Sequence, residues 1–383
     1  MNPNPANADN LNTADRSLSA YDYELPPERI AQHPVEPRDS ARLLAISPTS
    51  HSHRIFRDLP DLLSPGDLLV LNDTRVIPAR LYGRKPSGAA VEVLLLEERA
   101  ENCWLALVKP GKKLPTGATI EFSPQSEASE TLALTATVID RDEATGGRIL
   151  QFDVPPGVFL LDLLDRFGRV PLPPYITEFE ATGDTAALRE RYQTVYACHP
   201  GSAAAPTAGL HFTETLLQRL DERGIDRAFV TLHVGVGTFR PVEVEDITAH
   251  SMHAEWAKVP PDTVDRIRQT QARGGRVIAV GTTAVRSLES AAQSGELQPF
   301  CGKTNLFIYP GYQWRVVDGL ITNFHLPKSG LLMLVSAMVG RERLLRLYRE
   351  AIDLQYRFFS FGDAMLIEKF GSKRCALATP TGD

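Results

Sequence analysis

The sequence lacks the features that mark secreted, disulfide-linked and membrane-spanning proteins. Its first twenty residues are polar and contain no basic stretch followed by an apolar one, so a secretory signal is not expected. The longest apolar run, Leu331 to Gly340, is far shorter than the roughly 20 residues that cross a bilayer. The four cysteines have none of the short spacings of a zinc or redox pair; they are Cys103, Cys198, Cys301 and Cys375. We therefore expect reduced cysteines, a cytoplasmic location and no membrane association.

Excess basic charge and two common catalytic motifs are also missing. The formal net charge is -6, whereas proteins that coat nucleic acid without specificity carry an excess of lysine and arginine. A local basic face is still compatible with this total. The chain has neither the G-x-S-x-G turn of many hydrolases nor a Walker phosphate-binding loop, which removes two common enzyme classes.

Length and pattern predict two domains. The chain has 383 residues, 43% hydrophobic and 23% charged, which is typical of a globular protein too long for one core. Short β-rich runs separated by proline and glycine fill Asp67 to Val154 and predict a small antiparallel barrel or sandwich. After Pro156 helical patterns alternate with single apolar strands, which is typical of an α/β domain. We expect a discontinuous main domain (21–62 and 156–370), an insertion (63–155), a disordered tail (1–20) and a flexible tail (371–383).

The segment GSAAAPTAGLHFT, residues 201–213, is rich in small side chains that let a ligand approach the backbone. Thr213 is a predicted N-cap of a helix that ends near Gly224, and the free amides of a helix start can hold an anion. Thr207 and His211 are therefore candidate site residues. The alternative is a tight loop in which a backbone carbonyl satisfies His211.

Two further segments place glycines where a strand ends. In TLHVGVGTFRPV, residues 231–242, a strand containing His233 leads to Gly235 and Gly237, but position 240 is arginine where a dinucleotide fingerprint needs a third glycine. In RVIAVGTTAVRSLES, residues 276–290, Gly281, Thr282 and Thr283 open a helix and Arg286 follows one turn later. That turn could hold a carboxylate or phosphate, although many such turns bind nothing.

Histidines and clustered charges add weaker signals. His250 and His253 are three residues apart and have no third ligand at a recognisable spacing, so no metal site is predicted. His325 lies in ITNFHLPKSGLLMLV, after a predicted strand and before an apolar helix. Polar residues between two apolar elements suggest a binding site. The run LNDTRVIPARLYGRK concentrates charge that could contact RNA or simply face solvent; its charged residues are Asp73, Arg75, Arg80, Arg84 and Lys85.

Taken in order, eight motifs resemble the S-adenosylmethionine:tRNA ribosyltransferase-isomerase family of queuosine biosynthesis. The similarity runs from about Tyr21 to Ile367 and departs from the expected pattern only at Ala203, Val236, Ala284, Ser287 and Gly330, where no charge is lost. The motifs are LNDTRVIPARLYG, GSAAAPTAGLHFT, TLHVGVGTFRPV, HSMHAEW, VIAVGTTAVRSLES, FIYPGY, LITNFHLPKS and YRFFSFGDAMLI.

This resemblance implies an α/β main domain with an inserted antiparallel β-barrel domain, acting as a monomer without metal or separate cofactor. S-adenosylmethionine would be consumed as a substrate. Its ribosyl part would be transferred and isomerised onto 7-aminomethyl-7-deazaguanine at the wobble position of a tRNA with a GUN anticodon. The implied products are adenine, methionine and epoxyqueuosine-tRNA.

The implied chemistry assigns roles to the candidate residues. A sulfonium acidifies the neighbouring ribose 5′ methylene, so a base of near-neutral pKa, His211 or His325, would remove that proton. Asp73 or Glu255 would take a proton from the substrate amine. The other expected contacts are Gly281, Thr282, Thr283 and Arg286 for the methionine carboxylate, Thr207, Gly235 and Gly237 for substrate, and Arg75, Arg80 and Lys85 for an unpaired anticodon loop.

Two other classes of function stay open on the residues alone. One is a noncatalytic RNA-binding protein that uses the β-rich domain as a platform and leaves S-adenosylmethionine intact. The other is an oxidoreductase or methyltransferase on a Rossmann-like sheet, which the missing third glycine disfavours.

Overall fold

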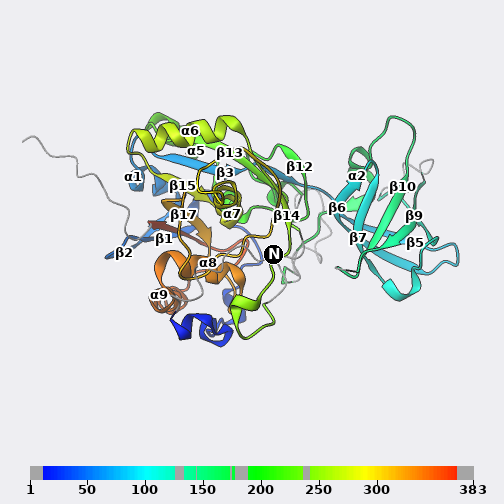
Figure 1. Ribbon diagram of the computed structural model, residues 1–383, viewed down its shortest axis with the longest axis horizontal. Helices are drawn as coiled ribbons and strands as arrows, with labels where there is room; N and C mark the ends of the chain where they lie inside the picture. Colours follow the sequence, from blue (N-terminus) through cyan, green and yellow to red (C-terminus); the bar gives the residue numbers. More distant parts are fainter. Residues whose placement is uncertain are drawn as a thin grey trace, which may run out of the picture. The chain divides into compact units, whose positions relative to one another are not determined.

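The computed structural model describes residues 12–125, 133–143, 145–172, 175–176, 189–235 and 242–368. The chain forms two compact units (Figure 1). The first unit comprises Met1–Asp73, Pro206–Leu232 and Pro241–Asp383, and the second comprises Thr74–Ala205 and His233–Arg240. Along the described residues, none of the helices combines the length and apolar character that a bilayer crossing requires.

The first unit is built on a nine-stranded mixed sheet. Its central strands β13, β3, β15 and β17 run parallel to one another, and nearly every residue in them is buried. Continuous apolar runs such as LLVL in β3 are typical of parallel strands covered on both faces. In spatial order the strands are β16 (Phe300–Thr304), β14 (Glu255–Val259), β13 (Asp226–Leu232), β3 (Leu68–Asn72), β15 (Val277–Val280), β17 (Gly319–Asn323), β18 (Ala364–Glu368), β1 (Arg42–Ile46) and β2 (His51–Ile55).

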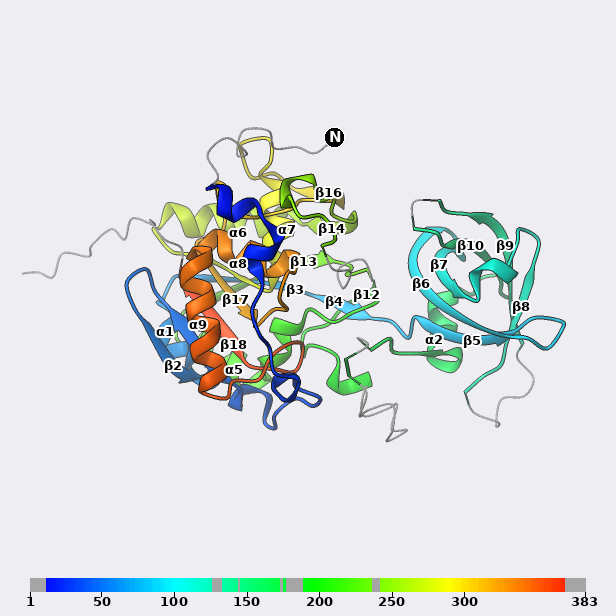
Figure 2. The same cartoon turned by 90° about the horizontal axis from the view of Figure 1, so that it is seen from below.

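Helices supply much of the rest of the first unit. Thr213 caps the helix that the sequence predicts there, because its hydroxyl accepts a hydrogen bond from the Leu216 amide. Helices α8 and α9 lie side by side in both views (Figures 1 and 2). The helices are α1 (Leu59–Leu62), α5 (Glu214–Glu222), α6 (Pro261–Ala272), α7 (Thr282–Ala291), α8 (Gly330–Val339) and α9 (Arg341–Asp353).

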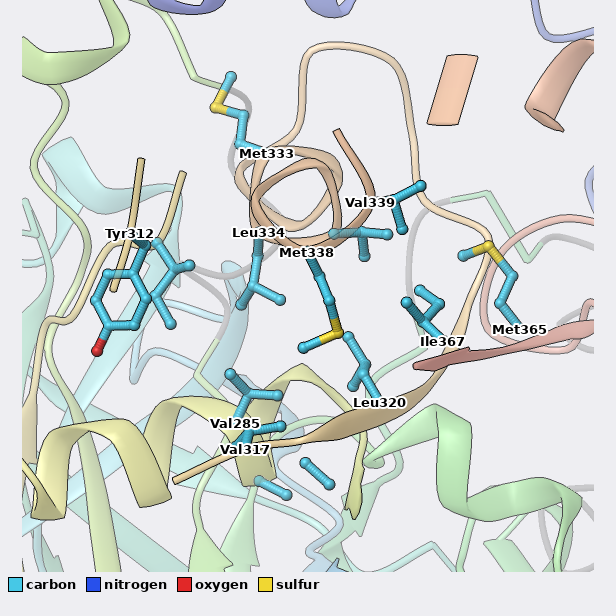
Figure 3. Close-up of a cluster of buried hydrophobic side chains, with 14 of the residues drawn as sticks. Val285, Tyr312, Val317, Leu320, Met333, Leu334, Met338, Val339, Met365 and Ile367 are labelled. Atoms are coloured by element: carbon cyan, nitrogen blue, oxygen red, sulfur yellow. The ribbon is translucent and has the colours of Figure 1, made fainter. Parts of the chain in front are cut away.

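The core of this unit joins α7 and α8 through the sheet. Figure 3 shows Met338 of α8 pointing toward Leu320 of β17 and Val285 of α7, and all three are buried. Helix α7 also carries buried charge. The Arg286 guanidinium binds the Glu255 carboxylate of β14 and donates to the carbonyls of Leu306 and Thr304. Polar contacts that cannot reach water therefore fix α7 against β14 and β16.

The second unit contains a closed antiparallel barrel of six strands. The strands are β5 (Arg80–Arg84), β6 (Ala90–Ala100), β7 (Cys103–Lys109), β10 (Arg148–Asp153), β9 (Leu134–Arg141) and β8 (Thr119–Phe122), in that spatial order, and β8 pairs back onto β5. Gly83 makes the closure feasible, because a Cβ atom there would lie 2.7 Å from the Glu121 carbonyl oxygen.

Shorter elements complete the second unit. Helix α2 (Leu160–Phe167) buries its apolar face in the barrel core, and β11 (Gly168–Arg169) pairs with β5. Strands β4 (Thr74–Val76) and β12 (His199–Ser202) form a separate parallel pair. The predicted fold class, an α/β main domain with an inserted antiparallel β-barrel, is confirmed.

The structure corrects three of the predicted boundaries. Strand β3, predicted to belong to the insertion (63–155), lies inside the nine-stranded sheet, because an apolar run looks alike in a barrel and in a parallel sheet. Residues 156–172, predicted to belong to the main domain, carry α2 and β11 of the barrel unit. In the predicted tail (1–20), the structured part includes 3-10 turns η2 (Thr13–Arg16) and η3 (Leu18–Tyr21), with Leu18 buried. Residues 1–11 and the predicted tail at 371–383 lie outside the described residues.

The buried pair gives a stability prediction. Replacing Glu255 by Gln leaves the Arg286 charge buried without a counter-ion, so the free energy of unfolding should fall by about 3–5 kcal/mol. Urea denaturation measures this change. The matched control is Asp265→Asn, which breaks an exposed pair with Arg268 at 3.9 Å and should cost about 0–1 kcal/mol. Equal losses for the two variants would contradict a special role of the buried pair.

Candidate functional site

The carboxyl ends of β13, β3, β15 and β17 share one edge of the sheet, because the four strands are parallel. Ligands of open α/β sheets bind at this edge. The residues that gather there, all within the first unit, are named the strand-end site: the sequence-predicted Asp73, Thr207, turn Gly281–Thr283 and His325, together with Asn323.

The turn Gly281–Thr283 has the properties of an anion site. Gly281 has a φ of 87°, which favours glycine, and it precedes α7 without a side chain that could cap the helix. The first amides of α7 thus have no side-chain acceptor in the described structure. The Thr283 hydroxyl is buried and lacks a hydrogen-bond partner within the described residues. Free amides, a helix dipole and an unused hydroxyl together suit a carboxylate.

Thr207 links this turn to the end of β17. It lies in the 3-10 turn η9 (Thr207–His211), and its hydroxyl donates to Asn323 Oδ1 at 2.9 Å. The Asn323 amide in turn donates to the Phe359 carbonyl at 3.1 Å. A Cβ atom at Gly281 would lie 3.8 Å from the Ala208 side chain, so η9 and the turn are neighbours. Three separated segments of sequence therefore converge at the strand-end site.

His325 follows β17 and is held through one of its nitrogens. Its Nε2 atom lies 2.8 Å from the Thr322 hydroxyl, and within the described part of the chain its Nδ1 atom has no hydrogen-bond partner. Burial lowers the pKa of the imidazole to about 3. The ring is therefore neutral at physiological pH. If Nε2–H donates to Thr322, the Nδ1 lone pair can accept a proton.

His211 is placed differently, and the prediction that it acts as a base loses its support. Its Nε2 lies 2.8 Å from the Gly362 carbonyl and its Nδ1 lies 3.2 Å from the Ala208 carbonyl. The ring is 5% exposed and stacks on Phe56 at 4.9 Å. Burial lowers its pKa, and a neutral ring has one N–H, which donates to the carbonyl of either Gly362 or Ala208. Both nitrogens therefore face backbone carbonyls in the core.

Asp73 follows β3 and is almost fully buried. Its Oδ1 accepts a hydrogen bond from the Thr231 hydroxyl at 2.7 Å, and its amide donates to the Val230 carbonyl. The preceding Asn72 makes two hydrogen bonds to the backbone of Leu232, at 3.0 Å each. The end of β13 therefore fixes the position of the Asp73 carboxylate.

Arg286 and Glu255 are the second correction. Each is at most 6% exposed, and the three guanidinium nitrogens of Arg286 are used by Glu255 and two carbonyls. Each nitrogen of the Arg286 guanidinium therefore already has a partner inside the core, and the Glu255 carboxylate is paired with it. The sequence predicts that both residues touch substrate, but their contacts are those of core residues that fix α7.

His233 is a candidate that the sequence points to only indirectly, through its glycine-rich neighbourhood. In the second unit its Nδ1 lies 2.8 Å from the Thr74 hydroxyl, and burial lowers its pKa to about 4. A Cβ atom at Gly201 would lie 2.7 Å from His233 Nε2, so the glycine makes room for the ring. Gly235 follows with open space where a Cβ would be, and the other predicted contact, Gly237, lies outside the described residues.

The predicted RNA contacts all lie in the second unit but on different strands. Arg75 is exposed on β4. Arg80 begins β5 and pairs with Glu92 at 3.5 Å. Lys85 follows β5 and donates to the Lys113 carbonyl at 2.6 Å. In HSMHAEW the His250 ring packs edge-on against Phe307, and no group of metal ligands that includes His250 or His253 occurs among the described residues.

Comparison with known proteins gives consistent matches. A family model described as queuosine biosynthesis protein matches residues 18–367. The S-adenosylmethionine:tRNA ribosyltransferase-isomerase of Nostoc sp. is 64% identical over 371 residues, covering 92% of each chain. The enzyme of that name from Gloeobacter violaceus is 57% identical over 358 residues, covering 93% of this chain and 97% of its own.

A solved structure agrees with these matches. The crystal structure of the S-adenosylmethionine tRNA ribosyltransferase from Thermotoga maritima is 41% identical. The match has a TM-score of 0.51 and covers 91% of this chain and all of that one. Sequence, family model and fold therefore give the same answer. The chain belongs to the queuosine biosynthesis family of S-adenosylmethionine:tRNA ribosyltransferase-isomerases.

Proposed function

We propose that this transferase moves and isomerises the ribosyl part of S-adenosylmethionine onto 7-aminomethyl-7-deazaguanine at the tRNA wobble position. The products are epoxyqueuosine-tRNA, adenine and methionine. One observation within the strand-end site carries the proposal: an uncapped helix start with an unused hydroxyl lies at the same sheet edge as a neutral histidine. The names of the related enzymes, which include S-adenosylmethionine and tRNA, support the two substrates.

S-adenosylmethionine binds with its methionine carboxylate on the turn Gly281–Thr283. The amides of the first turn of α7 and the Thr283 hydroxyl supply the hydrogen bonds, and the helix dipole favours the negative charge. Thr207 borders this position through Asn323. S-adenosylmethionine is a substrate that the reaction consumes, and the proposed chemistry uses no metal.

His325 is the proposed base. The sulfonium makes the ribose 5′ C–H acidic, and His325 Nδ1 takes that proton while Nε2–H stays on Thr322. The protonated ring then gives this proton to the departing adenine, which needs one to leave as a neutral base. His325 thus returns to its neutral state within one turnover.

Asp73 receives the proton that the aminomethyl group loses when its nitrogen forms the new bond. Thr231 holds the carboxylate of Asp73 at the end of β3, next to the strand that carries Gly281. A carboxylate accepts a proton from an amine only as the amine nitrogen forms its new bond and loses its basicity. The proposed role is therefore late in the reaction.

The barrel presents a surface suited to an unpaired anticodon loop. Arg80, Tyr82 and Arg84 alternate with buried Leu81 along β5 and so share its outer face. Tyr82 is 47% exposed, and the Arg169 guanidinium lies 5.3 Å from its ring centroid. An exposed ring among arginines can stack on a base while the cations contact phosphate. Arg75 and Lys85 extend the set of phosphate contacts.

The remaining parts of the proposal concern the tRNA and the state of the enzyme. We infer a tRNA with a GUN anticodon, a monomer and a cytoplasmic location. The family resemblance supports the anticodon and the monomer. The free cysteines Cys103, Cys198 and Cys301 are compatible with a reducing compartment.

The reaction is tested with purified protein, S-adenosylmethionine and tRNA bearing the aminomethyl base. We expect a nucleoside with the mass of epoxyqueuosine and one adenine per turnover. His325→Asn should lower kcat by about 10²–10⁴-fold and leave S-adenosylmethionine affinity unchanged, because general acid–base catalysis has that magnitude. His211→Asn, the matched control, should mainly lower the unfolding temperature. If the wild-type protein binds the RNA but releases no adenine, it is a noncatalytic RNA-binding protein and the proposed function is wrong.

The RNA surface is tested by the triple variant Arg75→Glu, Tyr82→Ala, Lys85→Glu. Its KM for tRNA should rise, and the dependence of tRNA affinity on salt should weaken by about one unit of log–log slope for each cation that no longer binds a phosphate. The control is Lys258→Glu, which changes an exposed lysine on β14 in the first unit. A triple variant that carries Tyr82→Phe in place of Tyr82→Ala should recover only the part of the tRNA affinity that comes from base stacking. If the KM for tRNA and the salt dependence of tRNA affinity are unchanged, this face of the barrel does not contact tRNA.

A further inference from the structure

The outer strand of the large sheet carries two histidines that share one carboxylate. His51 and His53 are two residues apart on β2, so both side chains lie on the same face of the strand. Glu350 of α9 reaches this face. Strand β2 pairs with β1 at the end of the strand order and is one edge of the sheet.

The ligand atoms of these residues already form a tight triangle. Glu350 Oε1 lies 3.0 Å from His51 Nε2 and 3.1 Å from His53 Nε2. All three atoms lie within 4.8 Å of one another, and no other such group of His, Cys, Asp and Glu occurs among the described residues. Nitrogen and oxygen ligands at about 2.0–2.2 Å from one ion lie at comparable distances from each other.

The supporting contacts keep the ligands in place. His53 Nδ1 lies 2.8 Å from the Tyr356 hydroxyl, so Nε2 is the nitrogen that faces Glu350. Tyr356 is fully buried and packs on Phe324 at 5.4 Å. A second hydrogen bond of this kind on a histidine ligand is characteristic of protein metal sites. Glu350 stands on a helix whose opposite side is anchored in the core by residues such as Tyr348.

The triangle is also accessible. The side chains of the two histidines are each 32% exposed and that of Glu350 is 41% exposed. An ion can therefore enter from solvent, and water can complete its coordination. Two imidazoles and one carboxylate suit a borderline ion such as Zn²⁺, whereas Mg²⁺ and Ca²⁺ prefer sets made only of oxygen ligands.

We propose that His51, His53 and Glu350 bind one Zn²⁺ ion, which fastens the edge strand β2 to α9. The site takes no part in the proposed reaction. It lies on the same stretch of chain as Phe359, whose carbonyl accepts a hydrogen bond from Asn323 in the strand-end site. The same contacts can also be hydrogen bonds from the two imidazoles to the Glu350 carboxylate with no ion present. Measuring Zn²⁺ binding distinguishes a metal site from such a hydrogen-bonded cluster.

The full chain, stripped with a chelator and free of any histidine tag, is titrated with ZnCl₂ by calorimetry. We expect one ion per chain and a rise in the unfolding temperature on addition of Zn²⁺. Substitution of His51 by Asn, His53 by Asn or Glu350 by Gln should lower the affinity by at least about tenfold and abolish the thermal shift. Tyr356→Phe, which keeps the ring and removes the hydroxyl, should weaken binding about 10–100-fold.

His33→Gln is the control, since it removes an exposed histidine that is not part of the triangle. It should bind Zn²⁺ like the wild-type chain, and circular dichroism of each metal-free variant shows that the fold is kept. The proposal is overturned if the wild-type chain takes up no Zn²⁺, or if the ligand variants bind it as tightly as the His33 control. A result of either kind leaves adenine release by the wild-type enzyme unaffected, so the proposed reaction is judged separately.

Discussion

The buried ion pair between Arg286 and Glu255 is the constraint on which the strand-end site depends. It fixes α7 to β14, and the guanidinium also donates to the carbonyls of Leu306 and Thr304. Because α7 cannot slide, its first turn stays at the end of β15 with its amides uncapped. A buried charge pair thus holds the uncapped start of α7 in place, where many helices have a capping side chain.

Contacts with distant segments also distinguish two similar histidines. His211 has a carbonyl near each ring nitrogen, one of them 151 residues away at Gly362. His325 is held on one side by a hydroxyl three residues away and keeps its second nitrogen unbonded within the described structure. Spacing in the sequence cannot distinguish the two residues, since the decisive partners come from distant segments.

Local chemistry can be predicted from the sequence and long-range pairing cannot. The Thr213 cap and the Gly281 turn depend on neighbouring residues and are found where the sequence predicts them, and the β-rich runs between Arg80 and Asp153 form the predicted barrel. The sheet to which β3 belongs is decided by its neighbours in space. Its apolar run alone therefore wrongly predicts a barrel strand. The sequence predicts a ligand for Arg286 because the true partner, Glu255, lies 31 residues away and cannot be identified from the local motif. The contact between His53 and Glu350 is not predicted for the same reason, since 297 residues separate them.

The proposed site depends most directly on the turn Gly281–Thr283 binding the carboxylate of S-adenosylmethionine. The direct test compares equilibrium binding of S-adenosylmethionine and of its decarboxylated form to the wild-type chain and to Thr283→Val. The wild-type chain should prefer the carboxylate form by about tenfold or more, as expected for a charge-assisted hydrogen bond at a helix start. Thr283→Val should lose much of that preference while binding the decarboxylated form as before. Equal affinity of the wild-type chain for the two ligands would contradict the assignment of the site.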